Sequence, residues 1–136
     1  MSDYVVKIAL IASIILMGYN ISEFVASYKI VSEKASQFLQ MAKDNAASDV
    51  DLRRSNLLLS SVLSIGYAVL IYFSDIVFWL VAIVVIKLLV TLLLSDKVLI
   101  QVLHDKELSQ KSFLVSKYDA LFNAVMGLAF ALVLVL

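Results

Sequence analysis

The chain of 136 residues contains no cysteine and no proline, and it has only three glycines and one histidine. Without cysteine the sequence excludes disulfides, thiol catalysis and the usual zinc sites, which need more ligands than one histidine supplies. Three glycines do not build a glycine-rich phosphate loop, and neither H-E-x-x-H nor G-x-S-x-G occurs. Without proline, no helix has a forced kink. We therefore expect no enzyme activity, no cofactor and no metal.

Charged residues are also scarce in this chain. Only 16% of its residues are charged, with 11 basic and 11 acidic side chains, whereas 62% are hydrophobic, and the mean hydropathy is +0.99. An ordinary soluble domain is about 45–50% apolar and about 25% charged, and a chain this short buries only about two-thirds of its surface. The composition argues against soluble globular, disordered and nucleic-acid-binding proteins. It predicts a membrane protein, most of whose residues lie in the lipid bilayer.

Four apolar stretches are long enough to cross a membrane, which takes about 20 residues. They predict an all-α integral membrane protein, a four-transmembrane-helix bundle that forms one domain over residues 1–136. Unbroken apolar runs are typical of spanning helices, because the strands of a membrane barrel alternate apolar and polar residues. The acidic start and long apolar run of the first stretch favour a retained span over a cleaved signal peptide. The expected spans are about residues 4–28, 55–74, 76–94 and 120–136.

Basic residues indicate how the spans are oriented, because they are enriched in short cytoplasmic loops. The connection over residues 29–54 contains five basic residues and the connection over 95–119 contains four, whereas the turn Ser74-Asp75 contains none. Both long connections are therefore expected in the cytoplasm and both termini outside. Short loops and the lack of cysteine favour a bacterial inner membrane.

The cytoplasmic connections carry apolar residues at helical spacing. In the first connection, Val31, Ala35 and Phe38 predict that the first helix continues about three turns beyond the membrane. In the second connection, Leu99 and Val102 extend the third span in the same way. We expect two helical cytoplasmic hairpin extensions that pack on each other.

Two sequence pairs resemble capping boxes, in which a serine at a helix start is followed three residues later by an acidic side chain. Ser48 with Asp51 is expected to open the helix of the second span, and Ser116 with Asp119 is expected to precede the fourth.

Two ionisable side chains lie inside the expected spans, where such groups are costly and are functional candidates by default. Lys87 lies about 10 Å from the cytoplasmic end of its span and Glu23 about 8 Å from that of the first, at about 1.5 Å per residue. The two spans run in the same direction, and the two depths differ by less than the reach of a lysine. We expect an ion pair between Lys87 and Glu23, within one chain or between subunits. The alternative is that Lys87 reaches to the headgroups.

Every span also places a polar residue in its cytoplasmic half. The candidate intramembrane polar cluster consists of Asn20, Glu23, Lys87 and Asn123. Such groups either join helices by hydrogen bonds of modest strength or line a polar pocket open to the cytoplasm. Hydrogen bonding between helices is the favoured interpretation for Thr91 and for the serines of the second span. For the cluster of Asn20, Glu23, Lys87 and Asn123, both interpretations are kept.

Small residues recur at intervals of four on three spans, and this spacing predicts close approach of helices. They are Gly18, Ser22 and Ala26 in the first span, Ser60, Ser64 and Ala68 in the second, and Gly127 and Ala131 in the fourth. The spacing predicts packing and carries no information about a ligand.

Two functions fit this arrangement. The first is a non-catalytic, homo-oligomeric scaffold, regulatory or accessory subunit that works by helix association. The alternative is a small oligomeric ion channel or transporter in which Lys87 and Glu23 line or gate the path. The apolar outer half gives one subunit no polar route, which favours the first. The expected partners are the lipid bilayer, further copies of the chain and a cytoplasmic or intramembrane protein, with no nucleic acid.

Overall fold

The computed structural model describes residues 3–136, which form five α-helices and no strand. In chain order these are α1 (Asp3–Val25), α2 (Tyr28–Asp44), α3 (Asp49–Tyr72), α4 (Phe78–Asp105) and α5 (Gln110–Val135). Four of the helices, all but α2, are long and apolar enough to cross a membrane. The expectation of an all-helical protein is thus confirmed, and the four apolar helices suggest membrane insertion.

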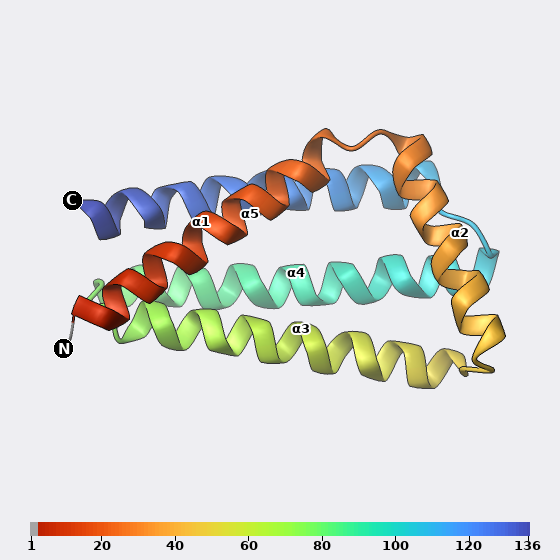
Figure 1. The fold of residues 1–136 in the computed structure, drawn as a ribbon, viewed down its shortest axis with the longest axis horizontal. Coiled ribbons are helices and arrows are strands. Elements are labelled where there is room, and N and C mark those ends of the chain that lie inside the picture. Colours follow the sequence, from red (N-terminus) through yellow and green to blue (C-terminus); the bar gives the residue numbers. More distant parts are fainter. Residues whose placement is uncertain (1–2) are drawn as a thin grey trace.

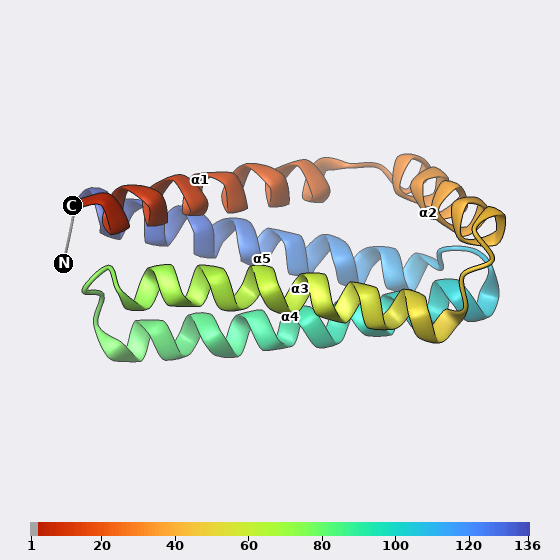
Figure 2. The ribbon, with the colours of Figure 1, turned by 60° about the horizontal axis from the view of Figure 1, so that its bottom comes forward.

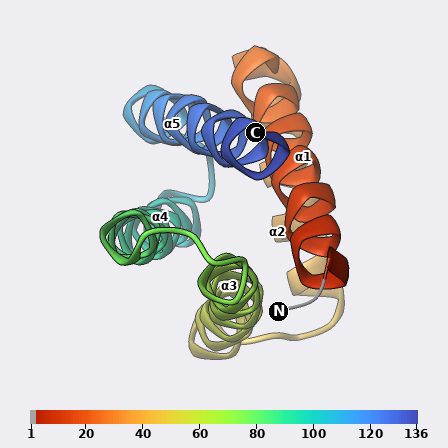
Figure 3. The same cartoon turned by 90° about the vertical axis from the view of Figure 1, so that its left-hand side faces the viewer.

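The four long helices lie beside one another, and α2 crosses one end of the bundle (Figure 1, Figure 2). We call this the α2 end; it also holds the turn between α4 and α5. The opposite end, the termini end, holds the start of α1, the α3–α4 turn and the end of α5. The most extensive contacts are those of α1 with α5 and of α3 with α4. Seen along the bundle, α1 runs obliquely, so its beginning lies near α3 and its end lies away from it (Figure 3).

The first helix does not continue into the connection as expected. It ends at Val25, and a separate helix begins at Tyr28. Ser27 between them has an extended backbone, with φ −74° and ψ 158°, and its hydroxyl accepts a hydrogen bond of 3.3 Å from Ile30 N. A serine in this conformation satisfies one of the free N–H groups at a helix start. The break allows α2 to turn across the bundle end (Figure 1).

Ser48 caps α3 as expected. Its hydroxyl accepts a hydrogen bond of 3.1 Å from Asp51 N, so this prediction is confirmed. Asp49 and Asp51 both lie in the first turn of the helix, where negative charge interacts favourably with the helix dipole. The helix of the second expected span therefore starts well before its apolar part.

The second expected cap, at Ser116, is wrong. α5 already begins at Gln110, and Ser109 caps it by accepting a hydrogen bond of 3.1 Å from Ser112 N. A serine followed by an acidic residue occurs in helix interiors as well as at helix starts, so the pair alone did not fix the position of the cap. As a consequence Asp119 lies inside α5, and its side chain is available for contacts with a neighbouring helix.

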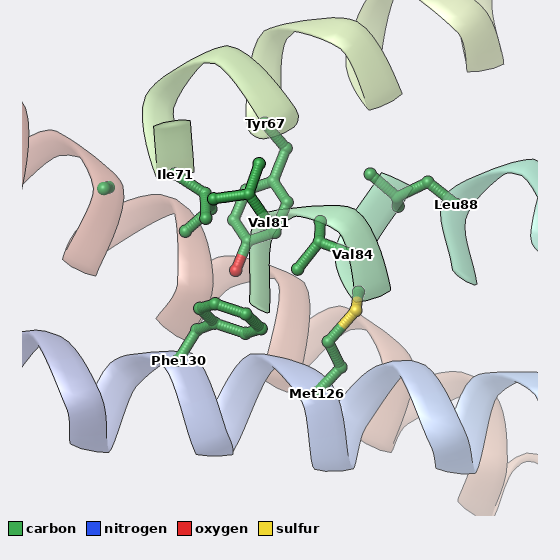
Figure 4. Packing of buried hydrophobic residues seen from close by; sticks show 8 residues of the cluster. Tyr67, Ile71, Val81, Val84, Leu88, Met126 and Phe130 are labelled. Atoms are coloured by element: carbon green, nitrogen blue, oxygen red, sulfur yellow. The ribbon is translucent and has the colours of Figure 1, made fainter. Parts of the chain in front are cut away.

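Apolar side chains fill the half of the bundle nearer the termini end (Figure 4). The cluster draws on all four long helices and consists of Ala9, Tyr67, Ile71, Val81, Val84, Leu88, Met126 and Phe130. Ile71 and Val84 are completely enclosed. The Tyr67 hydroxyl also reaches Ser13 of α1, with 2.7 Å between the two oxygens. This half of the bundle is therefore closed by packed side chains.

A second, smaller apolar cluster lies at the α2 end, where Val102, Leu108 and Phe113 are buried under α2. The Tyr28 hydroxyl donates a hydrogen bond of 2.6 Å to the Leu108 carbonyl, and the ring of Tyr28 meets that of Phe113 edge-on at 5.4 Å. These contacts hold the start of α2 against the turn between α4 and α5.

Large apolar side chains cover the outside of the long helices. Ile15 of α1, Leu58 of α3 and Ile86 of α4 each expose more than 60% of their surface. Soluble monomers avoid extended apolar surface of this kind. A helix with all its backbone hydrogen bonds internal and an apolar outer face fits a lipid environment.

Candidate functional site

Lys87 lies between α4 and α5, and all three of its N–H donors are used. Its Nζ is 2.7 Å from Asp119 Oδ1, 2.7 Å from Asn123 Oδ1 and 2.7 Å from Thr91 Oγ1. An ammonium group has three donors and no acceptor. The side chains of Lys87 and Asp119 are only 20% and 12% exposed. The lysine thus has a complete set of partners inside one chain.

Helical spacing explains why these groups meet. Lys87 and Thr91 are four residues apart on α4, and Asp119 and Asn123 are four residues apart on α5, so each pair shares one helix face. The Thr91 hydroxyl lies 3.3 Å from Asp119 Oδ1 and 3.2 Å from Asn123 Oδ1. Asn123 Nδ2 makes longer contacts of 3.4 Å to Asp119 Oδ2 and 3.5 Å to Asn20 Oδ1. We call these five residues the Lys87 network.

The network joins three of the five helices. Asn20 belongs to α1, and its side-chain amide donates a hydrogen bond of 2.8 Å to the carbonyl of Leu16 one turn earlier. No buried side-chain nitrogen or oxygen in residues 3–136 lacks a hydrogen-bond partner. Because unpaired buried polar groups are costly, these hydrogen bonds stabilise the polar side chains of the network in the bundle interior.

The structure brings Asn20, Lys87 and Asn123 together, as predicted for the polar cluster. It leaves Glu23, the fourth predicted member, out of the network. The ion pair expected between Lys87 and Glu23 is wrong within the chain, because Asp119 occupies that position. Comparison of depths along two spans gives the height of a side chain but not the direction in which it points around its helix. Glu23 lies near the end of α1, where this helix lies away from α3 (Figure 3) but its neighbour Phe24 still contacts Lys117 of α5.

Glu23 instead lines two adjoining cavities at the α2 end. The inner cleft has a volume of about 210 Å³, lies between α1, α4 and α5, and reaches Asp119 and Asn123. The vestibule has a volume of about 700 Å³ and receives side chains from all five helices. The residues that line both cavities are Tyr19, Glu23, Ser95, Val98 and Ser116. The polar pocket considered from the sequence thus has a physical counterpart beside the network.

A second polar contact joins α3 and α4 just past the apolar stretches. Arg53 donates to both carboxylate oxygens of Asp96, with Nε at 3.2 Å and Nη2 at 3.0 Å. These hydrogen bonds lower the pKa of the Asp96 carboxyl below its ordinary value. Next to this pair, Asn56 Nδ2 donates to Ser95 Oγ at 3.2 Å. Because the Arg53 side chain is 43% exposed, solvent screens the pair and limits its contribution to stability.

The small residues differ in what they do. A Cβ on Gly127 of α5 would lie 2.9 Å from the Ser13 carbonyl oxygen and 3.0 Å from Met17 N, both on the α1 backbone. A Cβ on Gly18 would meet nothing within 4 Å. Close packing of α1 on α5 therefore depends on Gly127, whereas the small face that includes Gly18 is open on the outside of α1.

Asp119 is the residue that sequence reasoning missed, because it was assigned to a helix cap. A signal was present in its spacing from Asn123, which matches the spacing of Lys87 from Thr91. Two helix faces that each carry a pair of complementary polar groups four residues apart are candidates for contact.

Comparisons of this chain with family models, with curated proteins and with solved structures found no match.

Proposed function

We propose that the four long helices span a membrane as a four-helix bundle, with the α2 end in the cytoplasm and both termini outside. Helices of this length, at about 1.5 Å per residue, exceed the hydrocarbon thickness of about 30 Å. The basic residues of the two connections gather at the α2 end, as cytoplasmic loops require. On this arrangement α2 and the adjoining parts of α4 and α5 form the cytoplasmic extensions, and the bacterial inner membrane is the proposed location.

In this setting the protein acts as a non-catalytic scaffold, regulatory or accessory subunit that works by helix association and forms homo-oligomers. The supporting observation is that Lys87 spends all three donors on Asp119, Asn123 and Thr91. A lysine that lined an ion path would present its charge or its N–H groups to the path. Here they are used to bind α4 to α5, which is a structural use of the charge.

A groove between α3 and α4 also supports association. It has a volume of about 390 Å³, its lining is almost entirely apolar, and it includes the small residues Ser61, Ser64 and Ala68. Small residues allow the backbone of a neighbouring helix to approach closely in a membrane. We propose that this groove contributes to the contact between copies of the chain.

The second candidate is a small oligomeric channel or transporter. It is favoured by the vestibule, into whose lining Glu23 brings a carboxylate. Against it, packed apolar side chains fill the other half of the bundle (Figure 4). A path through this protein would need a rearrangement of that half or a passage between subunits.

Reconstitution in liposomes separates the two candidates. The wild-type protein and Lys87→Met are compared for ion flux with an entrapped fluorescent indicator, and for subunit number by native mass spectrometry in detergent. Association predicts no flux above that of empty liposomes and a defined oligomer for the wild type. Lys87→Met is expected to weaken the oligomer only by destabilising each subunit, because the partners of Lys87 lie within one chain. A strictly monomeric wild type argues against the proposal, and so does a flux that Lys87→Met removes while the oligomer persists.

A further inference from the structure

The carboxylate of Glu23 has no hydrogen-bond or ion-pair partner within residues 3–136. It lines both the inner cleft and the vestibule, and the structure places it one turn from Asn20 on α1. A carboxylate that borders a partly enclosed cavity loses some of its hydration and interacts more strongly with an opposite charge than it would in bulk water.

The carboxylates of Glu23 and Asp119 both line the inner cleft, whereas no lysine or arginine is among its lining residues. The three donors of Lys87 are already used, and Asp119 Oδ2 receives only the long contact of 3.4 Å from Asn123. An ionised carboxylate accepts about four hydrogen bonds in all. Glu23 and Asp119 therefore keep unused acceptor capacity, and of these two carboxylates only Asp119 is paired with the ammonium group of Lys87. A molecule that fits this cleft brings N–H donors and a positive charge.

The vestibule supplies an apolar environment next to this negative site. Among its walls are Val31 and Phe38 of α2, Leu59 of α3 and Leu99 of α4. Binding sites for small molecules have volumes of about 300–1,000 Å³ and combine mostly apolar walls with a few polar groups. The inner cleft and the vestibule together match this description, with the polar groups at one end.

We propose that the inner cleft and the vestibule form one binding site for a small amphipathic organic cation, with its ammonium group against Glu23 and Asp119 and its hydrocarbon or aromatic part in the vestibule. Lys34 lines the vestibule but not the inner cleft, which places the charged end of the ligand in the cleft. A bare metal ion fits less well, since no three His, Asp or Glu side chains of the described residues converge to hold one. The proposal holds whether the protein acts by association or by transport.

Calorimetric titration of the full-length protein in nanodiscs tests the site. The probes are phenethylamine, a primary ammonium with a phenyl ring, and phenethyl alcohol, its uncharged analogue. We expect the amine to bind at least tenfold more tightly than the alcohol, because hydrogen bonds to charged groups are the stronger ones. Glu23→Gln is expected to weaken amine binding at least tenfold and to leave alcohol binding unchanged. Empty nanodiscs give the background from partition into lipid.

Matched variants exclude a general charge effect. Glu33→Gln removes the same charge from an exposed position of α2 and should leave the affinity unchanged. Lys34→Met removes a positive charge from the vestibule wall and should raise the affinity for the amine. Equal binding of amine and alcohol, or full amine binding by Glu23→Gln, overturns the proposal. A loss of affinity in Glu33→Gln as large as in Glu23→Gln does so too.

A second measurement uses the absence of native cysteine and does not depend on finding a tight ligand. Ser116→Cys places a thiol in the wall of both cavities. We expect a positively charged thiosulfonate reagent to modify it at least tenfold faster than a negatively charged one. Adding Glu23→Gln should reduce this ratio, and phenethylamine should slow the reaction. A ratio that is the same with and without Glu23 contradicts a cation site at this carboxylate.

Discussion

Lys87 and Asp119 bring opposite charges into a part of the bundle where neither would be stable alone. Their atoms lie 2.7 Å apart, and Asn123 and Thr91 complete the hydrogen bonding of the lysine. Removing two charges from water is costly, and the attraction between them offsets this cost only with good geometry and additional hydrogen bonds. Because each charge depends on the other, changes at the two positions are expected to be strongly non-additive.

A double-mutant cycle measures this dependence. Lys87→Met leaves the Asp119 carboxylate buried without a cation, and we expect a loss of about 3–5 kcal/mol in the free energy of unfolding. Lys87→Met combined with Asp119→Leu removes both charges and should recover most of that loss. Equilibrium unfolding by SDS in mixed micelles, followed by circular dichroism, gives the values.

Lys111→Met is the control for this cycle, because Lys111 is exposed at the start of α5; it should change stability by less than about 0.5 kcal/mol. If the double variant is as unstable as the sum of the single variants, the two residues are not coupled, and the network does not stabilise the bundle as described.

The sequence alone identified most residues of the Lys87 network. Residue type alone singled out Lys87, Asn20 and Asn123, because polar groups stand out in an apolar span. It could not supply the partner of the lysine, because both Glu23 and Asp119 lie within reach of Lys87 along the helix axes. Which carboxylate points toward α4 depends on the rotation of α1 and α5, and that is set by packing.

Among the helices, α1 and α5 pack most extensively. Their close approach depends on Gly127, which has no side chain to meet the α1 backbone. We expect Gly127→Ala to destabilise the protein by about 1–3 kcal/mol, because the new methyl group would meet the α1 backbone at Ser13 and Met17, which cannot give way as a flexible side chain would. Gly18→Ala should be neutral or stabilising by up to about 1 kcal/mol, since alanine favours the helix and the space is open.

The same unfolding assay compares the two glycine variants, and the comparison is informative because both add one methyl group to a helix. A large loss in Gly18→Ala with little change in Gly127→Ala would mean that the outer face of α1, and not its α5 face, forms the tight contact. An interface between copies of the chain at Gly18 would give this result.

The existence of the four long helices followed from hydropathy, but their limits did not. The break at Ser27 and the start of α5 at Gln110 are set by serine caps, and serine is too common in this chain for its position to mark a helix start without the tertiary contacts. The turns also use left-handed backbone at Ala46, Asp75 and Lys106, where glycine would have been the usual signal. Alanine, aspartate and lysine at these positions therefore do not allow the turns to be predicted from the sequence.

Taken as a whole, the molecule differs between its two ends. Side chains fill the half near the termini end, the Lys87 network lies near the middle of the bundle, and the inner cleft and the vestibule lie between the network and the α2 end. α1 makes this difference, because its oblique course brings its beginning close to α3 and takes its end away (Figure 3). If the α2 end is cytoplasmic, any ligand reaches the site from that side.

The orientation itself is tested by single cysteines in the cysteine-free chain. Val77→Cys lies in the exposed α3–α4 turn and Gln37→Cys on the exposed side of α2, and neither replacement alters the basic residues that set the orientation. In intact cells a membrane-impermeant maleimide should label Val77→Cys at once and Gln37→Cys only after permeabilisation. The reverse pattern would place the vestibule outside the cell. Labelling of both positions in intact cells would mean that the chain does not have the single orientation that its basic residues indicate.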